Sequence, residues 1–327
     1  MESSLEIGFL RASEKAAIAS ARTMGFGNRK YSDQVAVESM REELGRLKMR
    51  GRVVIGEGER DKAPMLFVGE QLGRGYEDGN QHFPEVDIAV DPLEGTNLCA
   101  LGTPNSIAVL AASERGGLLH APDIYMDKIV VGPTAGPAVS LDNSVEENLK
   151  GIAEAFGRAI NQLTIVVLDR ERHHDLIASI REAGARIKLI SDGDLSAGIA
   201  AAVRGTGIHG AMGIGGAPEG VLTAAAMRCL GGRMVGRLRP LEKWQEERLR
   251  EMGFDDSNKV YETEELASGK DLIFSATGVT DGDLLRGVRF FQGGIRTSSL
   301  FLSLKTNTIR FVDTIYKEEG GDLAVVF

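Results

Sequence analysis

The chain has 327 residues, a formal net charge of -9 and 43% hydrophobic residues. This length is large for a single core, so two subdomains are expected, and the acidic balance argues against a nucleic-acid-binding surface. The N-terminal residues carry charges and no apolar run is long enough to span a bilayer, so we predict neither a signal peptide nor a membrane partner. The two cysteines form no evident bridge framework, which favours reduced thiols and a cytoplasmic protein.

The first half of the chain predicts a mixed sheet with helices packed on it. Helices are expected at residues 2–24 and 33–50, the second with apolar residues at helical spacing. A helix or turn is expected from Pro64, and residues 73–85 are polar and glycine-rich, which indicates a surface loop. Strands are expected at residues 53–56, 86–90, 106–112 and about 128–131.

In the second half, strands and helices alternate, which predicts βαβ crossovers and a parallel sheet. Polar residues follow three successive strands, and ligands bind outside the carboxyl ends of such strands. The tail, residues 272–327, returns to a β pattern. We therefore expect a mixed α/β fold divided into residues 1–160 and 161–327. Strands are expected at 164–168, 186–190 and 209–214, and helices at 144–158, about 173–183, 194–203 and 218–230.

Carboxylates gather at the predicted strand ends and turns. One apolar strand runs into Glu57 of GEGERD, a second runs into Asp91 and Glu94 of DPLEGT, and Glu219 of GGAPEG opens a helix. Hard oxygen ligands on rigid strand ends suit Mg²⁺ or Mn²⁺. A pair of such ions can clamp the attacking and leaving oxygens of a phosphoryl displacement. The residues alone therefore predict a metal-dependent phosphatase.

Each motif also has a purely structural explanation. DPLEGT could be an acidic turn that caps the next helix, although the apolar strand before it favours metal binding. GEGERD could be a solvated acidic loop, and Asp33 could be an ordinary helix cap. The GIGGAPEGV glycines could form a plain turn, although a plain turn would not explain the carboxylate in the first helical turn.

Sequence spacing alone does not decide the role of the basic residues either. Arg170 and Arg172 suit phosphate, which guanidinium groups bind through charge-assisted and often bidentate hydrogen bonds, but they also suit a solvated helix start. His173 and His174 are adjacent on a predicted helix and so point apart. All five histidines are left out of the predicted metal site.

Taken together, DPLEGT, GEGERDKAPM, APDIYM, ISDGDLSAGI and GIGGAPEGV resemble the class II fructose-1,6-bisphosphatases over nearly the whole chain. The likeness is strongest to the cyanobacterial-type fructose-1,6-/sedoheptulose-1,7-bisphosphatase branch, through DPLEGTNLCALG, AAAMRCLGG and GVRFF. It implies the layered αβαβα sandwich of the lithium-sensitive sugar and inositol phosphatase superfamily. It also implies a requirement for Mg²⁺ or Mn²⁺ and a homo-oligomer, either a dimer or a tetramer.

The resemblance further implies residue roles, with metal binding in the first subdomain and substrate binding in the second. The implied metal ligands are Asp33, Glu57, Asp91, Glu94 and Glu219. The implied catalytic residues are the carboxylates Glu59 and Asp61 and the water-orienting hydroxyl of Thr96. The implied substrate contacts are Arg29 or Lys30, Gly95, Thr96, Tyr125, Arg170, Arg172, Asp192, Asp194, Gly216 and Glu219.

From this resemblance we expect hydrolysis of the 1-phosphate of fructose 1,6-bisphosphate to fructose 6-phosphate, a gluconeogenic step. Sedoheptulose 1,7-bisphosphate stays open as a second substrate. One alternative is an inositol-type monophosphatase or a bisphosphate nucleotidase; the two arginines with Asp192 and Asp194 argue against the monophosphatase. The other alternative is a non-catalytic phosphometabolite sensor, which the retained ligand positions disfavour.

Overall fold

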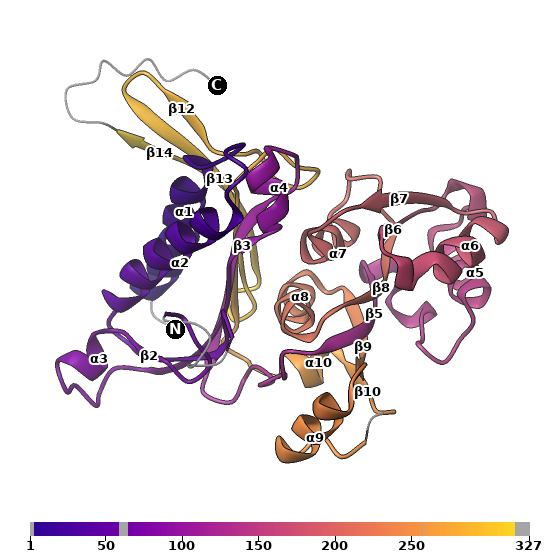
Figure 1. Cartoon of the computed structure of the whole chain (residues 1–327), viewed down its shortest axis with the longest axis horizontal. Helices are drawn as coiled ribbons and strands as arrows, with labels where there is room; N and C mark the ends of the chain where they lie inside the picture. The colour runs from indigo at the N-terminus through magenta and orange to yellow at the C-terminus, as the bar shows by residue number, and fades with distance from the viewer. Residues whose placement is uncertain (1–2, 59–64, 257, 318–327) are drawn as a thin grey trace. The chain divides into compact units, whose positions relative to one another are not determined.

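The computed structural model describes residues 3–58, 65–256 and 258–317. Chain contacts divide it into two compact units (Figure 1). Unit 1 takes its described residues from Met1–Glu114 and Ile273–Phe327, and unit 2 is Arg115–Leu272. Each unit combines one sheet with helices, and each sheet mixes parallel and antiparallel pairs. The expected mixed α/β fold class is therefore confirmed.

The division into units differs from the expected one at residue 160. Unit 1 is discontinuous because the strands near the C-terminus return to the sheet of the N-terminal segment: β11 pairs antiparallel with β4, from Ile273 opposite Ala112 to Gly278 opposite Ile107. Unit 2 is an insertion between these two strands. The pairing joins segments that are far apart in the sequence, so no local pattern marks it.

Unit 1 contains an eight-stranded sheet in the order β12-β13-β11-β4-β3-β1-β2, with β14 paired to β13. Only β1 and β3 are paired in parallel among the described strands of this sheet. The helices of unit 1 are α1 (Ser3–Ala21), α2 (Arg29–Gly45), α3 (Arg74–Glu77) and α4 (Thr96–Leu101). The strands are β1 (Arg50–Ile55), β2 (Gln71–Leu72), β3 (Glu85–Glu94), β4 (Ile107–Glu114), β11 (Ile273–Gly278), β12 (Arg289–Phe291), β13 (Gly294–Ser303) and β14 (Thr308–Lys317).

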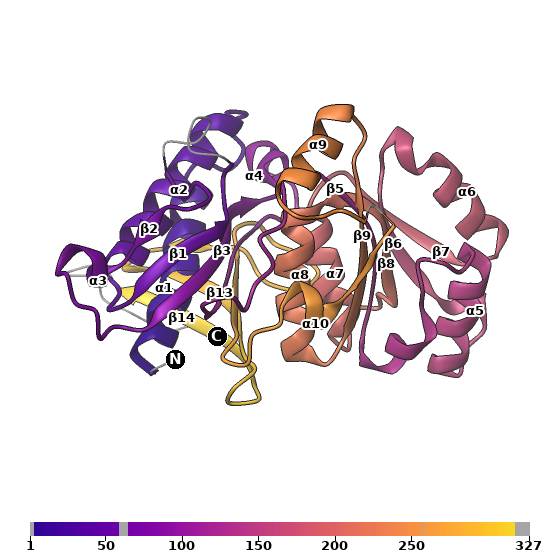
Figure 2. The same cartoon turned by 90° about the horizontal axis from the view of Figure 1, so that it is seen from below.

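Helices α1 and α2 lie side by side on one face of this sheet (Figures 1 and 2). Their apolar side chains form one core with alternate residues of the strands, for example Phe9 and Met40 with Ile88 and Leu110. Helix α2 begins at Arg29, earlier than the expected start at residue 33. Asn28 caps it by accepting a hydrogen bond from the Tyr31 N–H at 3.2 Å. Asp33 therefore lies within the helix and is not its cap.

Helix α1 is also joined to the sheet by buried hydroxyl groups. Ser13 Oγ lies 2.7 Å from Ser275 Oγ and 3.0 Å from Thr277 Oγ1, and Thr277 Oγ1 lies 2.8 Å from Ser299 Oγ. All four side chains are fully buried. Buried hydroxyls are costly unless they are paired, so this chain of hydrogen bonds fixes the helix at one position along β11 and β13.

Unit 2 contains a six-stranded sheet in the order β10-β9-β5-β8-β6-β7. Its helices are α5 (Val145–Phe156), α6 (His174–Glu182), α7 (Asp194–Ala202), α8 (Ala217–Leu230), α9 (Lys243–Glu251) and α10 (Thr263–Leu266). Its strands are β5 (Tyr125–Val131), β6 (Thr164–Leu168), β7 (Arg186–Ile190), β8 (Gly210–Gly216), β9 (Arg233–Arg239) and β10 (Val260–Glu262). Short 3₁₀ turns cover Pro133–Ala138, Ile160–Gln162 and Glu171–His173.

The helices of unit 2 cover both faces of its sheet. Helices α5 and α6 pack on one face, where Ile129, Ile165 and Val167 meet Leu149 and Ile180; α7 and α8 lie on the other (Figures 1 and 2). Strands β7, β6 and β8 are neighbours in the sheet and run parallel. The expected βαβ crossovers are therefore confirmed, and the carboxyl ends of these three strands form one edge.

Two further expectations concern the loops of unit 1 and the lack of a membrane-spanning helix. The loop at residues 73–85 contains the short helix α3, and residues 65–70 form turns and bends. In the described residues, we find no helix whose length and hydropathy would let it span a bilayer.

We expect the Thr277→Val substitution to weaken unit 1. Valine keeps the shape of threonine but leaves the buried hydroxyls of Ser13 and Ser299 with one partner fewer, which costs about 1–3 kcal/mol. Urea denaturation followed by circular dichroism would show a lower midpoint. The Thr134→Val variant is the matched control, because Thr134 is exposed. Equal midpoints in both variants would remove the hydroxyl chain from the forces that hold α1.

Candidate active site

A break in the regular pairing of β3 sets the direction of two carboxylates. Asp91 lies opposite Val109 and Glu94 lies opposite Ile107, so three steps along β3 match only two steps along β4. Residues three apart on a regular strand point to opposite faces. Because one extra residue is inserted here, as in a β-bulge, Asp91 and Glu94 share one face of the sheet. Pro92 suits this position since it has no N–H to contribute to the ladder.

The two carboxylates come close together. They offer ligand oxygens within 4.8 Å of one another, Asp91 is half-buried and Glu94 is 6% exposed. Asp91 Oδ1 accepts a hydrogen bond from the Leu93 N–H at 3.1 Å, which holds its carboxylate in place. Like charges at this separation destabilise each other unless a cation or a proton neutralises them. The donor set of hard oxygens fits Mg²⁺ or Mn²⁺.

The turn after these carboxylates positions Thr96. Gly95 has φ of 76°, in the left-handed region that favours glycine, and precedes α4. Thr96 Oγ1 donates to the Leu93 carbonyl at 3.0 Å. Its proton is thus committed to the backbone, and its oxygen can only accept a further hydrogen bond. A group bound at Thr96 must therefore donate, as a water molecule does.

The remaining metal-ligand predictions in unit 1 fall on α2 and after β1. Burial raises the pKa of Asp33 above its usual range, so its charged form would gain from a nearby cation. Since β1 and β3 are parallel with Ile55 opposite Ala89, Glu57 follows its strand at about the level of Asp91. Within the described residues, neither Asp33 nor Glu57 joins the Asp91–Glu94 pair at the same short separation. Glu59 and Asp61 lie outside the described residues.

Of the two basic candidates in unit 1, Arg29 makes a side-chain hydrogen bond. Arg29 Nη1 donates to Asn97 Oδ1 at 2.8 Å, which ties the start of α2 to α4. Lys30, the next residue, is exposed.

In unit 2, Glu219 lies in the first turn of α8, as expected from the sequence. Its side chain folds back over Gly216: a Cβ atom at Gly216 would lie 1.9 Å from Glu219 Oε2. Glycine at 216 leaves room for this carboxylate, which would have to move if residue 216 carried a side chain. The glycine-rich turn and the carboxylate are thus parts of one arrangement.

The two arginines predicted from the sequence are held by backbone carbonyls at the strand ends of unit 2. Arg170 Nη2 donates to the Ser191 carbonyl after β7 at 2.5 Å. Arg172 donates to the Ile214 carbonyl on β8 from Nε at 3.1 Å and from Nη2 at 2.9 Å. The Arg172 guanidinium also lies 4.9 Å from the centre of the Tyr125 ring, a cation–π contact. These contacts bring Arg170, Arg172 and Tyr125 to one edge of the sheet.

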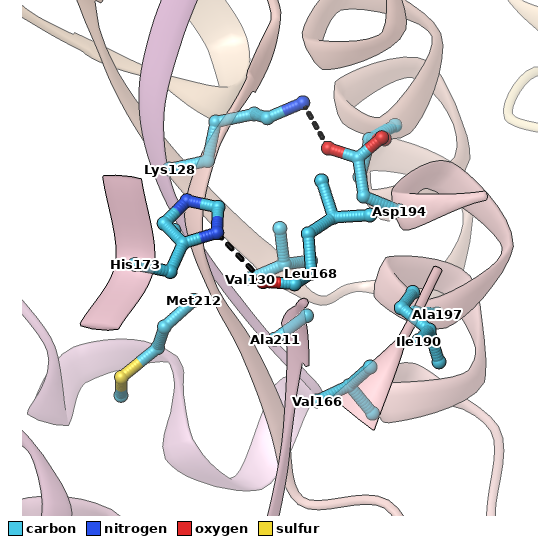
Figure 3. Close-up of a pocket in the computed structure, with 12 residues that line it drawn as sticks. Lys128, Val130, Val166, Leu168, His173, Ile190, Asp194, Ala197, Ala211 and Met212 are labelled. Atoms are coloured by element: carbon cyan, nitrogen blue, oxygen red, sulfur yellow. Dashed lines mark hydrogen bonds and ion pairs between the residues drawn. The ribbon is translucent and has the colours of Figure 1, made fainter. Parts of the chain in front are cut away.

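Lys128 is a residue of this edge that sequence reasoning missed. Its side chain is 7% exposed, its Nζ lies 2.6 Å from Asp194 Oδ2, and it donates to the Gly216 carbonyl at 3.0 Å (Figure 3). The cavity beside this ion pair is about 20 Å³, room for about one water molecule. The available signal was a lysine in the strand YMDKIVV, which is largely apolar apart from Asp127 and Lys128; a buried cation needs a fixed partner.

Asp194 is therefore paired with Lys128, whereas Asp192 contacts its own turn. Asp192 is half-buried, and its Oδ1 accepts a hydrogen bond from the Gly193 N–H at 3.2 Å. Gly215 leaves room for this ion pair, since a Cβ there would lie 2.1 Å from Asp194 Oδ2 and displace it. The carboxyl ends of β6, β7 and β8, together with Lys128 of β5, thus gather two carboxylates, one buried cation and two arginines.

Comparison with known proteins identifies the family of the chain. Residues 3–316 match the family model described as "Bacterial fructose-1,6-bisphosphatase, glpX-encoded". The chain belongs to this family. It is a family of class 2 phosphatases, in agreement with the acidic strand ends of unit 1 and the arginines of unit 2.

Relatives in cyanobacteria are similar over nearly their whole length. A "D-fructose 1,6-bisphosphatase class 2/sedoheptulose 1,7-bisphosphatase" of Synechococcus sp. (strain JA-2-3B'a(2-13)) is 55% identical, over 98% of this chain and 97% of the relative. The protein of the same name from Thermosynechococcus vestitus is 51% identical, over 97% of this chain and 96% of the relative. These matches confirm the resemblance that the motifs indicated.

A solved structure is also similar in part. The extragenic suppressor protein suhB from Bartonella henselae aligns with 62% of this chain and 74% of its own, with 14% identity and a TM-score of 0.34.

We expect the Lys128→Met substitution to destabilise unit 2. Removing one partner of a buried ion pair leaves the other charge uncompensated, which costs about 3 kcal/mol, at the lower end of the usual range because the Asp194 side chain is 24% exposed. Denaturant unfolding would measure the loss. The double variant Lys128→Met/Asp194→Leu should recover part of it, since no unpaired charge is left. Additive losses in the double variant would contradict a direct pair.

Proposed function

We propose that this chain hydrolyses the 1-phosphate of fructose 1,6-bisphosphate to fructose 6-phosphate and inorganic phosphate, with Mg²⁺ or Mn²⁺ as its cofactor. The observation that carries the proposal is the pair of carboxylates on one face of β3, within 4.8 Å of each other. The names of the cyanobacterial relatives support the substrate, and they support sedoheptulose 1,7-bisphosphate as a second one. The reaction would then serve gluconeogenesis.

The proposed metal ligands are Asp33, Glu57, Asp91, Glu94 and Glu219. Bound metal ions would polarise the reacting phosphate and lower the pKa of a water molecule. Glu59 and Asp61 are proposed as the catalytic carboxylates.

Two residues of the turn after β3 would orient the attacking water and bind the reacting phosphate. Thr96, whose proton is held by the Leu93 carbonyl, would accept a hydrogen bond from the attacking water and so orient it. The Gly95 N–H would contact the reacting phosphate. Attack by water leads directly to inorganic phosphate, so no covalent intermediate with the protein is expected.

Substrate recognition is proposed mainly for residues that follow the strands of unit 2. Arg170 and Arg172 would bind the distal phosphate, and Asp192 and Asp194 would accept hydrogen bonds from sugar hydroxyls. The further proposed contacts are Tyr125, Gly216, Glu219 and one of Arg29 and Lys30. A cytoplasmic location and a homo-oligomer, a dimer or a tetramer, complete the proposal.

A phosphate-release assay tests this function. The panel contains fructose 1,6-bisphosphate, sedoheptulose 1,7-bisphosphate, an inositol monophosphate and a 3′,5′-bisphosphate nucleotide, each with Mg²⁺, with Mn²⁺ and with a chelator. We expect release from the sugar bisphosphates with either metal and none with the chelator. Release from the inositol phosphate or the nucleotide alone would replace the proposal by that activity. Release from no substrate would favour a sensor.

We expect Asp91→Asn to lower the turnover number by orders of magnitude. Asparagine keeps an oxygen for the Leu93 N–H but removes the charge that would hold the metal, and bound metal supplies several kcal/mol of transition-state stabilisation. Thermal melting without metal should be unchanged or raised, because one of two repelling charges is gone. The control is Asp78→Asn, at an exposed aspartate after α3. Normal turnover with normal metal dependence in Asp91→Asn would remove this residue from the site.

We expect Arg172→Ala to discriminate between substrates. Loss of a charged hydrogen bond to the distal phosphate should lower kcat/KM for fructose 1,6-bisphosphate. The corresponding loss of transition-state stabilisation should be about 1.5–3 kcal/mol. Fructose 1-phosphate has no distal phosphate and should barely respond. Arg181→Ala, at an exposed arginine in the last turn of α6, is the matched control. Equal losses on both substrates would place Arg172 at the reacting phosphate or in the scaffold.

A further inference from the structure

Strands β6 and β8 separate before they reach the edge that carries the arginines. Their parallel pairing is confined to Ile165 opposite Gly210 and Val166 opposite Ala211. Beyond this point the Leu168 carbonyl and the Ile214 N–H need other hydrogen-bond partners, because buried backbone groups are rarely left unpaired. The side chain of His173 supplies both partners.

The imidazole of His173 lies between the separated strands. The ring is 1% exposed, its Nδ1 lies 2.8 Å from the Leu168 carbonyl oxygen, and its Nε2 accepts a hydrogen bond from the Ile214 N–H at 2.7 Å. Figure 3 shows the ring directed at the Leu168 carbonyl. One ring thus continues the ladder between β6 and β8 after direct pairing has ended.

These two partners fix the protonation state of the ring. A carbonyl can only accept and an N–H can only donate, so Nδ1 carries the proton and Nε2 is bare. Burial lowers the pKa of His173, and the charges that act on the ring are Arg172 beside it, Asp127 on β5 and Asp194 on α7. A proton on Nε2 would face the Ile214 N–H and break the bridge.

The backbone around Ile214 is shaped to fit this ring. Gly213 has φ of 134°, and a Cβ atom there would lie 2.9 Å from His173 Nε2, so the ring takes the place of a side chain. The Ile214 carbonyl receives both hydrogen bonds from Arg172. The N–H and the carbonyl of one residue are therefore held by two neighbours in sequence, His173 and Arg172.

We propose that neutral His173 is a positioning residue for substrate recognition: it fixes Ile214, and through the Ile214 carbonyl it fixes the guanidinium of Arg172 that receives the distal phosphate. The proposal rests on the proposed function through the role of Arg172. Ile214 also leads into Gly215 and Gly216, which pack against Asp194 and Glu219. A shift of this residue would move the glycine turn as well.

Three variants separate the bridge to Ile214 from simple packing. His173→Phe keeps a ring but removes both hydrogen bonds. His173→Gln places an amide oxygen near the position of Nε2 and can still accept from the Ile214 N–H. His173→Asn places its amide near Nδ1 and serves only Leu168. The matched control is His174→Phe, because His174 is exposed at the start of α6.

We expect the phenylalanine and asparagine variants to raise KM for fructose 1,6-bisphosphate about tenfold, the effect of losing one well-placed hydrogen bond. Their kcat should stay within about twofold, because the reacting phosphate is untouched. The glutamine variant should restore most of the KM, and fructose 1-phosphate should respond to none of them. An unchanged KM in His173→Phe, or equal losses on both substrates, would overturn the positioning role.

A measurement without substrate keeps this inference separate from the proposed function. In protein labelled with ¹⁵N-isoleucine, exchange of the Ile214 N–H with solvent should be fast in the phenylalanine and asparagine variants and slow in the parent and the glutamine variant. Fast exchange in the parent would overturn the bridge whatever the activity. Slow exchange in a parent that releases no phosphate from sugar bisphosphates would retain the bridge, refute the proposed function and overturn the link to substrate recognition.

Discussion

Two carboxylates of one strand must share one face of a sheet although they are three residues apart. The bulge between Asp91 and Glu94 meets this constraint, and the rest of unit 1 supports it. Neighbouring strands on both sides hold β3 in place, and helices α1 and α2 close one face of the sheet. A rigid frame is needed because the charges repel each other at this separation. Packing of the rest of unit 1 offsets the repulsion between the two carboxylates, and a bound cation would relieve that repulsion.

Sequence patterns predicted the elements that carry these groups but not their orientation. DPLEGT follows an apolar strand, so the site at its end could be expected from local periodicity. Whether Asp91 and Glu94 point the same way depends on their register with β4, which is a non-local property. The start of α2 was missed for a local reason: Asn28 is the cap, and the apolar pattern begins only several residues later. The discontinuous unit was missed because β11 pairs with a strand more than 150 residues earlier, from Ile273 to Ala112.

The residues that sequence reasoning overlooked share one property: each is a single polar side chain buried in an apolar setting. Lys128 lies in a mostly buried strand, and His173 follows two charged positions that resemble a solvated helix start. Neither has a motif, because the partners are backbone carbonyls, one backbone N–H and one distant carboxylate. Composition cannot indicate such partners, whereas a folded chain must provide them, since an unpaired buried polar group is costly. A lysine in a largely apolar strand is therefore a useful signal even when its partner cannot be identified from the sequence.

The way the arginines are held explains how unit 2 could select a phosphate. Arg172 places two of its five N–H donors on the Ile214 carbonyl, and the Tyr125 ring lies against the same guanidinium. The remaining donors then have a fixed direction before any ligand arrives. Long side chains lose rotamer entropy when they bind, and a group already ordered by the protein does not lose it again. Arg170 is held by two backbone carbonyls, since Nη2 donates to Ser191 and Nη1 donates to Asp169. Recognition of a distal phosphate would thus depend on backbone carbonyls at strand ends, whose positions are determined by the sheet and by the ring of His173.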